Sequence, residues 1–143
     1  MSAVELISKN LASKIVNSRQ ANPKRFYFEV KAADVRETVE YLFNGLNLRF
    51  VTVSGVDMRE GIEMMYHLSD DSTGTVVTMR AMISDKKNPR IDSIAKIIIG
   101  AAWIEREIHE LLGVDFAGND NLKHLLLPED WPKNNYPLRH DNE

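Results

Sequence analysis

The segment WIEREIHELLG, residues 103–113, concentrates ionisable side chains that could do chemistry. Glutamate and histidine are residue types that serve as general acids, general bases and metal ligands. The segment follows a strongly apolar stretch, so the charged residues begin abruptly along the sequence. They could form a catalytic cluster, a metal site, a solvated face or a docking surface. The ionisable residues are Glu105, Arg106, Glu107, His109 and Glu110.

The residues HELLG at the end of this segment begin like the zinc-protease motif His-Glu-x-x-His. That motif works because two histidines four positions apart share one face of a helix. Here Gly113 stands where the second histidine would be, and the other histidines are scattered along the chain. The sequence therefore predicts no zinc hydrolase site and no metal ligands.

No other catalytic or phosphate-binding motif is present. The glycines do not form GxGxxG or GxxxxGK[ST], and there is no Gly-x-Ser-x-Gly segment. The absence of cysteine excludes disulfides, thiolate zinc sites and cysteine-ligated iron–sulfur clusters. Any electron-transfer role must therefore be played by something bound elsewhere.

Length and composition favour one soluble domain. The 143 residues are 43% apolar and 27% charged, with a net charge of -3. A negative balance argues against nucleic acid as the main partner, because a phosphate-binding face needs a basic excess. No apolar run of 18 residues could span a membrane, and the start MSAVELISKN is a poor signal peptide. The simplest location is the cytoplasm.

Apolar spacing and turn residues predict an α+β domain over residues 1–113, with a mixed or antiparallel sheet of about four strands and helices packed on one face. The connectors DMREG and DDSTG predict an antiparallel meander for the last three strands. The helix before them requires a crossover, so the first two strands could form a parallel pair. The predicted elements are a helix over 3–19 broken at Asn22-Pro23, a strand over 25–31, a helix over about 35–44 with Asp34 and Glu37 as a capping pair, and strands over 48–57, 62–70 and 75–83.

A third helix, capped by Asp92 or Ser93 and ended by Gly113, carries the charged cluster. Projected at about 100° per residue, it has one apolar stripe that faces the core. The stripe consists of Ile97, Ala101, Ile104, Ile108 and Leu111, with Glu105 and Glu107 on its shoulders, Arg106 pointing away, and His109 and Glu110 further round the back together with Ile98 and Ile99.

Two interpretations of this helix remain open. A solvated charged side with an Arg106–Glu110 pair, contributing about 0.2–0.5 kcal/mol, explains the charges. It does not explain Ile98, Ile99 and Trp103, which indicate that the tail, another subunit or both cover the helix.

Residues 114–143 are predicted to form an extended, irregular C-terminal arm. Three of the five prolines lie here, around short apolar pieces, and the arm has too little core of its own to fold alone. It is either a terminal segment pinned by Trp131 and Tyr136, or a proline-stiffened arm that holds a neighbouring subunit. Neither interpretation involves catalysis.

The segment WIEREIHELLGVDFAGNDNLKHLLLPEDWPKNNYPLRHD resembles the signature region of the 30-kDa subunit family of respiratory complex I, the NADH:quinone oxidoreductase subunit designated C. The family includes the equivalent small subunit of energy-converting, membrane-bound nickel–iron (NiFe) hydrogenases. Upstream, VSGVD and MMYHLS resemble the paired strands of the family. The matching positions are Glu105, Arg106, Glu107, Gly113, Phe116, Gly118, Leu122, Leu126, Pro137, Leu138, Arg139 and Asp141.

The chain also departs from the family pattern. Glu110 replaces the usual aspartate, Gly118-Asn119-Asp120-Asn121 replaces Gly-His-Pro-Asp, and Lys123-His124 replaces a basic pair. Together with the short length and LPEDWP…YPLR, these departures favour the hydrogenase or archaeal branch over a standard NADH dehydrogenase member.

The resemblance implies a non-catalytic structural and assembly subunit of a membrane-bound, ion-translocating redox complex. Such a subunit binds no cofactor, lies in the peripheral arm on the cytoplasmic side of the membrane, and touches the membrane only indirectly. It packs against the large subunit, either 49-kDa-like or the NiFe large subunit, and against other peripheral-arm subunits. The residues expected to form the interface or pin the tail are Glu105, Arg106, Glu107, Glu110, Leu122, Pro128, Trp131, Pro137, Leu138, Arg139 and Asp141.

Two other functions compete with this one. The chain could be a soluble adaptor unrelated to redox work, which would share the interface signals. It could also be a stand-alone enzyme that uses Glu107, His109 and Glu110 as acid–base groups, since burial can raise the pKa of a glutamate. A pocket that joins those three side chains would favour the enzyme.

Overall fold

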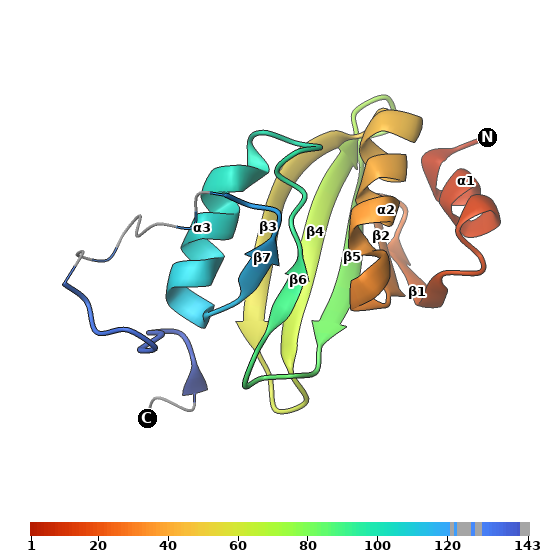
Figure 1. The fold of residues 1–143 in the computed structure, drawn as a ribbon. Helices are drawn as coiled ribbons and strands as arrows, with labels where there is room; N and C mark the ends of the chain where they lie inside the picture. Colours follow the sequence, from red (N-terminus) through yellow and green to blue (C-terminus); the bar gives the residue numbers. More distant parts are fainter. Residues whose placement is uncertain (121, 123–126, 128–129, 141–143) are drawn as a thin grey trace. The chain divides into compact units, whose positions relative to one another are not determined.

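The computed structural model describes residues 1–120, 122, 127 and 130–140 (Figure 1). The predicted residues Pro128 and Asp141 lie outside this part of the chain. In order, the elements are α1 (Ala3–Asn10), β1 (Ile15–Asn22), β2 (Arg25–Val30), the 3-10 turn η1 (Ala32–Asp34), α2 (Val35–Glu40), the π-helical turn η2 (Tyr41–Gly45), β3 (Arg49–Asp57), β4 (Ile62–Asp70), β5 (Thr75–Ile83), β6 (Arg90–Asp92), α3 (Ala101–Leu112) and β7 (Asp115–Ala117).

The fold is α+β with a mixed sheet, as predicted. Five strands lie in the order β1-β2-β5-β4-β3, where β1 pairs antiparallel and β5 pairs parallel with β2. The strands predicted as a meander, β3, β4 and β5, are neighbours in chain order. A second, two-stranded sheet pairs β6 with β7 in parallel. The short strand β7 falls within the segment expected to be irregular.

The predicted helix over residues 3–19 is wrong in its second half. The helix α1 begins after Ser2, whose side chain accepts a hydrogen bond from the Glu5 backbone N–H, and ends at Asn10. Residues 15–22 instead form β1, paired antiparallel with β2, and Pro23 lies in the connecting turn. Ile15 keeps helical spacing from Leu11, but strand pairing overrides that local pattern.

The expected pairing of the first two predicted strands is also wrong. The strand β2 is bonded to β5, and β3 lies at the far edge of the sheet. The connection through α2 therefore carries the chain from β2 past the positions of β5 and β4 to β3. The chain then returns through β4 to β5, which lies beside β2. This explains why the parallel pair joins segments distant in sequence.

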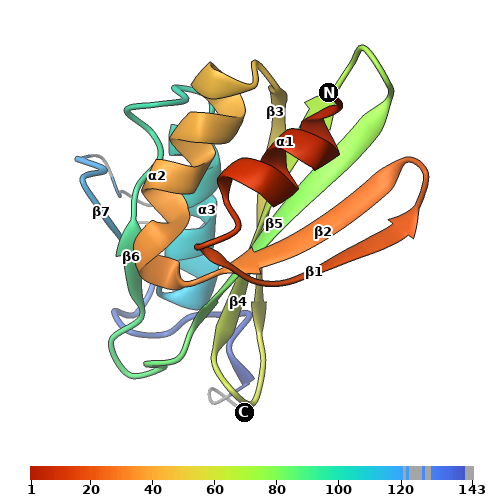
Figure 2. The ribbon, with the colours of Figure 1, turned by 90° about the vertical axis from the view of Figure 1, so that its right-hand side faces the viewer.

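The chain forms two compact units: residues 1–52 with 65–81, and residues 53–64 with 82–143. In the first unit α1 and α2 lie side by side (Figure 2), and the Asn10 amide donates to the Tyr41 hydroxyl at 2.7 Å. The buried apolar core of this unit comes from its helical segments and from β2, β4 and β5, and includes Ile7, Phe28, Val35, Val39, Leu42, Tyr66, Leu68, Val77 and Met79.

The second helix is near its predicted place, but its expected capping pair is not formed. Asp34 occupies the position before α2 without making a side-chain capping bond. The Lys14 ammonium attracts both carboxylates, at 3.9 Å from Asp34 and 3.1 Å from Glu37. The two acidic groups therefore bind the residue that precedes β1 rather than the helix end.

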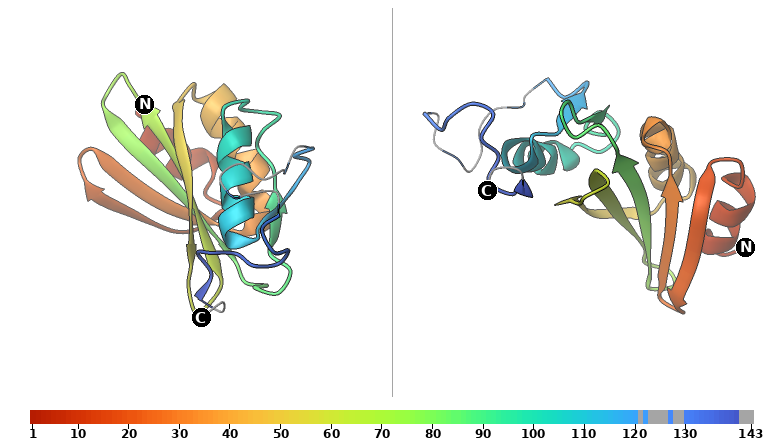
Figure 3. Two further views of the ribbon diagram at one scale, coloured as in Figure 1. Left: turned by 90° about the vertical axis from the view of Figure 1, so that its left-hand side faces the viewer. Right: turned by 90° about the horizontal axis from the view of Figure 1, so that it is seen from below.

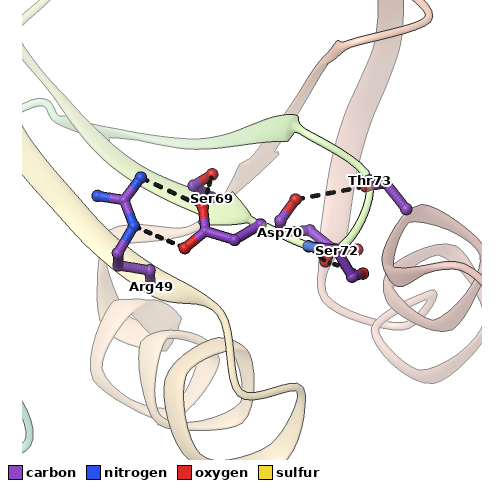
Figure 4. Close-up of polar contacts among 6 residues, drawn as sticks. Arg49, Ser69, Asp70, Ser72 and Thr73 are labelled. Carbon is purple, nitrogen blue, oxygen red and sulfur yellow. Dashed lines mark hydrogen bonds and ion pairs between the residues drawn. The ribbon is translucent and has the colours of Figure 1, made fainter.

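The turn between β4 and β5 is built from the predicted DDSTG segment (Figure 4). The Asp70 carboxylate accepts hydrogen bonds from the Ser72 backbone N–H at 3.1 Å and hydroxyl at 2.6 Å. The neighbouring Asp71 forms an exposed ion pair with Arg49 at 2.8 Å. These local bonds satisfy the polar groups of a tight turn.

In the second unit α3 lies beside the β6–β7 pair (Figure 3, cyan helix in the left panel). Gly55 of β3 allows a close approach, because a Cβ atom there would meet the Leu112 side chain at 2.8 Å. Gly113 ends the helix as predicted, with a left-handed φ of 79°. The predicted start is wrong: α3 begins at Ala101, and Ser93 bonds Glu105 instead of capping a helix.

Candidate docking site on the third helix

The buried face of α3 contains an acidic residue. Its buried positions at helical spacing are Ala101, Glu105, Ile108 and Leu112. The inward face is therefore rotated about the helix axis relative to the predicted stripe. Ile104 and Leu111, which belong to that stripe, are only half-buried. Sequence periodicity placed Glu105 on a shoulder, whereas the structure places it in the middle of the inward face.

Three hydrogen-bond donors hold the fully buried Glu105 carboxylate. The Ser93 hydroxyl donates at 2.6 Å, the Ile94 backbone N–H at 2.9 Å and the Asn119 amide at 3.0 Å. Burial raises the pKa of Glu105, and its effect outweighs these hydrogen bonds, each of which lowers that pKa. Glu105 thus ties together the segments before α3 and after β7.

The outward face of this region carries exposed apolar side chains. Ile99, just before α3, is 86% exposed, and Trp103 is 61% exposed. The Arg106 guanidinium lies 5.1 Å from the centre of the Trp103 ring, in a cation–π arrangement. Glu107 is exposed beside them. We call Ile99, Trp103 and Arg106 the outer patch.

His109 and Glu110 contact the residues that follow the helix. The Glu110 side chain is buried, contrary to its predicted place at the back of the helix, and accepts a hydrogen bond from the Leu127 backbone N–H at 2.8 Å. The His109 Nδ1 lies 2.8 Å from the Val114 carbonyl, so this nitrogen is the donor. A cavity of about 200 Å³ is lined by His109 and Glu110 but not by Glu107.

The C-terminal segment returns to the end of α3. The Leu138 backbone N–H donates to the Leu111 carbonyl at 2.9 Å. The buried Arg139 guanidinium donates to the Leu112 carbonyl at 3.1 Å and to the Lys86 carbonyl at 2.7 Å. Arg139 thereby satisfies a helix-end carbonyl that has no partner within α3.

The other predicted residues of this segment differ in exposure. Trp131 is half-buried, and its indole N–H donates to the Asn135 carbonyl at 2.8 Å. Leu122 is half-buried, whereas Pro137 and Leu138 are exposed. The predicted set therefore divides into residues that bind the chain itself and residues that face outward.

Asp57, at the end of β3, is a charged centre that sequence reasoning missed. Its buried carboxylate lies 2.6 Å from the Lys86 ammonium and 3.8 Å from the Arg139 Nε, and accepts from the His140 backbone N–H at 2.8 Å. Burial raises the pKa of Asp57, but the Lys86 and His140 hydrogen bonds and both cations together hold it below its usual value. The only sign of this centre in the sequence is an aspartate at the end of a strand rich in apolar residues.

Neither a metal cluster nor a membrane-spanning helix occurs within the described ranges. Among those residues, no group of three or more His, Cys, Asp or Glu side chains is placed to hold a metal ion. No helix of that same part of the chain is long and apolar enough to cross a membrane.

The chain is similar to a known family over most of its length. The family model described as respiratory-chain NADH dehydrogenase, 30 Kd subunit, matches residues 28–143. The F420H2 dehydrogenase subunit designated C of Methanosarcina mazei is 31% identical over 143 residues, covering 98% of this chain and 89% of that protein. The NADH-quinone oxidoreductase subunit of the same designation from Chloroherpeton thalassium is 30% identical over 131 residues, covering 88% of this chain but 54% of that protein.

A solved structure agrees with these sequence similarities. One chain of the membrane-bound sulfane sulfur reductase, described as an archaeal respiratory membrane complex, matches with a TM-score of 0.84 and 25% identity. The match covers 98% of this chain and 85% of that chain. The chain belongs to the family of the 30 Kd subunit of respiratory-chain NADH dehydrogenase, whose members are subunits of membrane redox complexes.

Proposed function

We propose that the chain is a non-catalytic structural and assembly subunit of a membrane-bound, ion-translocating redox complex of the NADH:quinone oxidoreductase or energy-converting hydrogenase type. It packs against the large subunit on the cytoplasmic side and holds that subunit in place. It contributes no cofactor and no chemical step of its own. Family membership and the redox complexes named for the similar proteins support this proposal.

The outer patch is the observation that carries the proposal. Ile99 and Trp103 expose most of their apolar surface while Glu105, on the other face of the same segment, is fully buried. Tryptophan and arginine are the residue types that most often anchor protein interfaces. Burying this patch against another subunit would remove apolar surface from water, at about 25 cal/mol per Å².

The acid–base enzyme finds less support. Glu107 is exposed and does not line the small cavity near His109 and Glu110. The Glu110 carboxylate already accepts a backbone hydrogen bond, and His109 donates to a carbonyl. These two side chains hold the C-terminal segment, so their geometry favours a structural role.

Affinity purification from the native host tests the proposal. The chain carries a tag, the membranes are solubilised in a mild detergent, and native mass spectrometry identifies the bound proteins. We expect a stoichiometric complex that contains the large subunit and other peripheral-arm subunits. Recovery of only the free monomer would contradict the proposal, and recovery with proteins of no redox complex would favour the soluble adaptor.

A pair of double variants locates the interface. Ile99→Ala/Trp103→Ala removes the outer patch, while Val16→Ala/Val51→Ala removes exposed apolar side chains elsewhere, which are 55% and 44% exposed. We expect the first variant to recover at least about tenfold less large subunit than the wild type does, which corresponds to roughly 1.4 kcal/mol of binding free energy. The second should recover it normally. Equal recovery by both would show that the outer patch is not the contact.

A further inference from the structure

A second surface feature of the second unit is a cavity of about 850 Å³, which we call the basic groove. The loop before β6, the end of α3, β7 and the C-terminal segment line it. Its charged lining is four basic side chains, Lys86, Lys87, Arg90 and Arg139, against one carboxylate, Asp115. This local excess of positive charge contrasts with the net charge of -3 on the whole chain.

Internal bonds fix two of these four cations. Lys86 forms an ion pair with Asp57 at 2.6 Å, and Arg139 donates to two backbone carbonyls. Their side chains are held before any ligand binds, so binding a ligand orders them at little further entropic cost. Asp57 neutralises part of their charge, which leaves the other two cations as the main source of positive potential.

Those two cations, Lys87 and Arg90, are exposed and have no ion-pair partner among the described residues. Asp85 forms an ion pair with neither cation among the described residues, and its carboxylate accepts from the backbone N–H groups of Lys87 and Asn88, both at 3.1 Å. Asp115 is the acidic side chain of the lining. The groove therefore offers cationic side chains to an anion from outside the chain.

Size and local polarity favour a peptide over a small phosphate. A volume of about 850 Å³ lies at the upper end of the range for ligand sites and has room for several residues. Gly113 places the C-terminal end of α3 at the groove, and a helix C-terminus carries partial negative charge that disfavours a compact anion. An extended chain with spaced carboxylates can reach the cations without approaching that end.

We propose that the basic groove binds an acidic segment, rich in aspartate and glutamate, of a neighbouring subunit in the complex. This inference rests on the proposed function, because it requires that the chain occupy a complex. It adds a contact separate from the outer patch and governed by charge. Lys87 and Arg90 are its exposed contacts, and Lys86 and Arg139 form its fixed floor.

Zero-length carbodiimide cross-linking of the native complex tests the contact, since the reagent joins an amine to a carboxylate that touches it. We expect mass spectrometry to find Lys87 joined to an aspartate or glutamate of another subunit. The Lys14–Glu37 pair within the chain, at 3.1 Å with an exposed carboxylate, is the positive control, and exposed Lys9 is the comparison. Lys87 without an intersubunit link, in a sample where Lys14–Glu37 is joined, would overturn the proposal.

Charge reversal provides the second measurement. Lys87→Glu/Arg90→Glu should lower recovery of the partner subunits at least about tenfold at 150 mM salt. The matched reversal Lys9→Glu/Arg36→Glu, on exposed helical positions, should leave recovery unchanged. Equal recovery with both variants would overturn the groove proposal while leaving the proposed function intact. If the wild-type chain recovers no partner, the proposed function itself fails.

A lipid headgroup is the remaining source of negative charge. Vesicles with and without anionic phosphatidylglycerol distinguish it by flotation of the purified chain. We expect no flotation that depends on Lys87 and Arg90. Flotation with anionic vesicles that Lys87→Glu/Arg90→Glu abolishes, together with no intersubunit link at Lys87, would assign the groove to a membrane and overturn the proposal.

Discussion

The inward face of α3 carries a buried carboxylate, whereas the outward side carries exposed apolar side chains. The inward face buries a carboxylate, Glu105, among apolar residues and satisfies it with three donors from the chain itself. On the outward side, Trp103 of α3 and Ile99, just before the helix, lie in solvent, with Arg106 over the indole ring. Polarity therefore does not indicate which side of this helix faces the interior.

Each face of the helix has its own role. A buried carboxylate is tolerated only where donors compensate for its lost hydration, so Glu105 fixes the surrounding loops. Exposed apolar surface contributes little to the isolated fold, and a contiguous patch of it marks a surface that binds a partner. The inward face should therefore govern stability, and the outward face should govern assembly.

The largest effect is expected from removing the inward carboxylate. Glu105→Ala leaves the Ser93, Ile94 and Asn119 donors without their acceptor and creates a cavity, at a cost of about 3–5 kcal/mol. Urea unfolding followed by circular dichroism measures the loss. Glu107→Ala, two residues further on and exposed, is the control and should change the free energy of unfolding by under about 0.5 kcal/mol. Equal losses would contradict the separation.

The next effect concerns the ion-paired carboxylate of the same unit. Asp57→Ala leaves Lys86 without its ion pair and the His140 N–H without its acceptor. We expect a loss of about 2–3 kcal/mol, because Lys86 is partly exposed and can regain water. Limited proteolysis should also cut the C-terminal segment faster than in the wild type. Unchanged cleavage would show that Asp57 does not hold that segment.

The end of α3 gives a smaller, steric effect. At Gly113, φ is +79° and a Cβ atom would lie 2.5 Å from the Tyr136 ring, so Gly113→Ala should cost about 1–2 kcal/mol. The control is Gly100→Ala at the start of the helix, where nothing lies within 4 Å. That change should be neutral or stabilising by up to about 1 kcal/mol. A neutral Gly113→Ala would disprove the close packing of Tyr136.

The two buried carboxylates should also respond to pH in opposite directions. The pKa of Asp57 is lowered from 3.8, so its stabilisation is present above pH 3.8 and is lost as pH falls through the folded-state pKa. The pKa of Glu105 is raised from 4.5, so its contribution is present below pH 4.5 and is lost as pH rises through the folded-state pKa. Each effect is limited to about 1.4 kcal/mol per pH unit.

Isosteric variants measure the pH-dependent contribution of each carboxyl group to the free energy of unfolding. Urea unfolding across pH 3–7 should show the stability difference between wild type and Asp57→Asn shrinking as pH falls below 3.8. The difference between wild type and Glu105→Gln should shrink as pH rises above 4.5. Parallel pH profiles for both variants would show that the two carboxylates do not differ as described.

The sequence predicted β2, β3, β4, β5 and the end of α3 well, whereas β6 and β7 were not predicted. Strands expected over 48–57, 62–70 and 75–83 begin and end within one residue of β3, β4 and β5, because alternation and turn residues are local signals. Gly113 was found for the same reason. The first strand, β1, was missed because its pairing with β2 overrides helical spacing that includes Ile15.

The candidate site was less accessible to sequence reasoning. A helical projection places glutamate outside, and only the donors at Ser93, Ile94 and Asn119 make the burial of Glu105 possible. Those donors come from segments on either side of α3. Asp57 and Lys86 lie far apart in the chain, and no local pattern joins them. The exposure of Trp103 and Ile99 agrees with the expectation of apolar side chains away from the core, but Ile98, expected with them, is buried, and both isoleucines precede α3.

The smallest effect on stability and the largest on assembly should come from the outward face. Trp103→Ala should change the free energy of unfolding of the isolated chain by about 0.5 kcal/mol or less, because the side chain is 61% exposed. Urea unfolding of the purified variant measures this change. A loss above about 1.5 kcal/mol would show that Trp103 supports the chain's own fold.

Hydroxyl-radical footprinting of the two tryptophans tests whether a partner subunit covers the outer patch. The oxidation rate of each indole is measured by mass spectrometry in the free chain and in the intact native complex, with half-buried Trp131 as the internal comparison. We predict that Trp103 oxidises rapidly in the free chain and at least about tenfold more slowly in the complex. Equal oxidation of Trp103 in both samples would contradict the account.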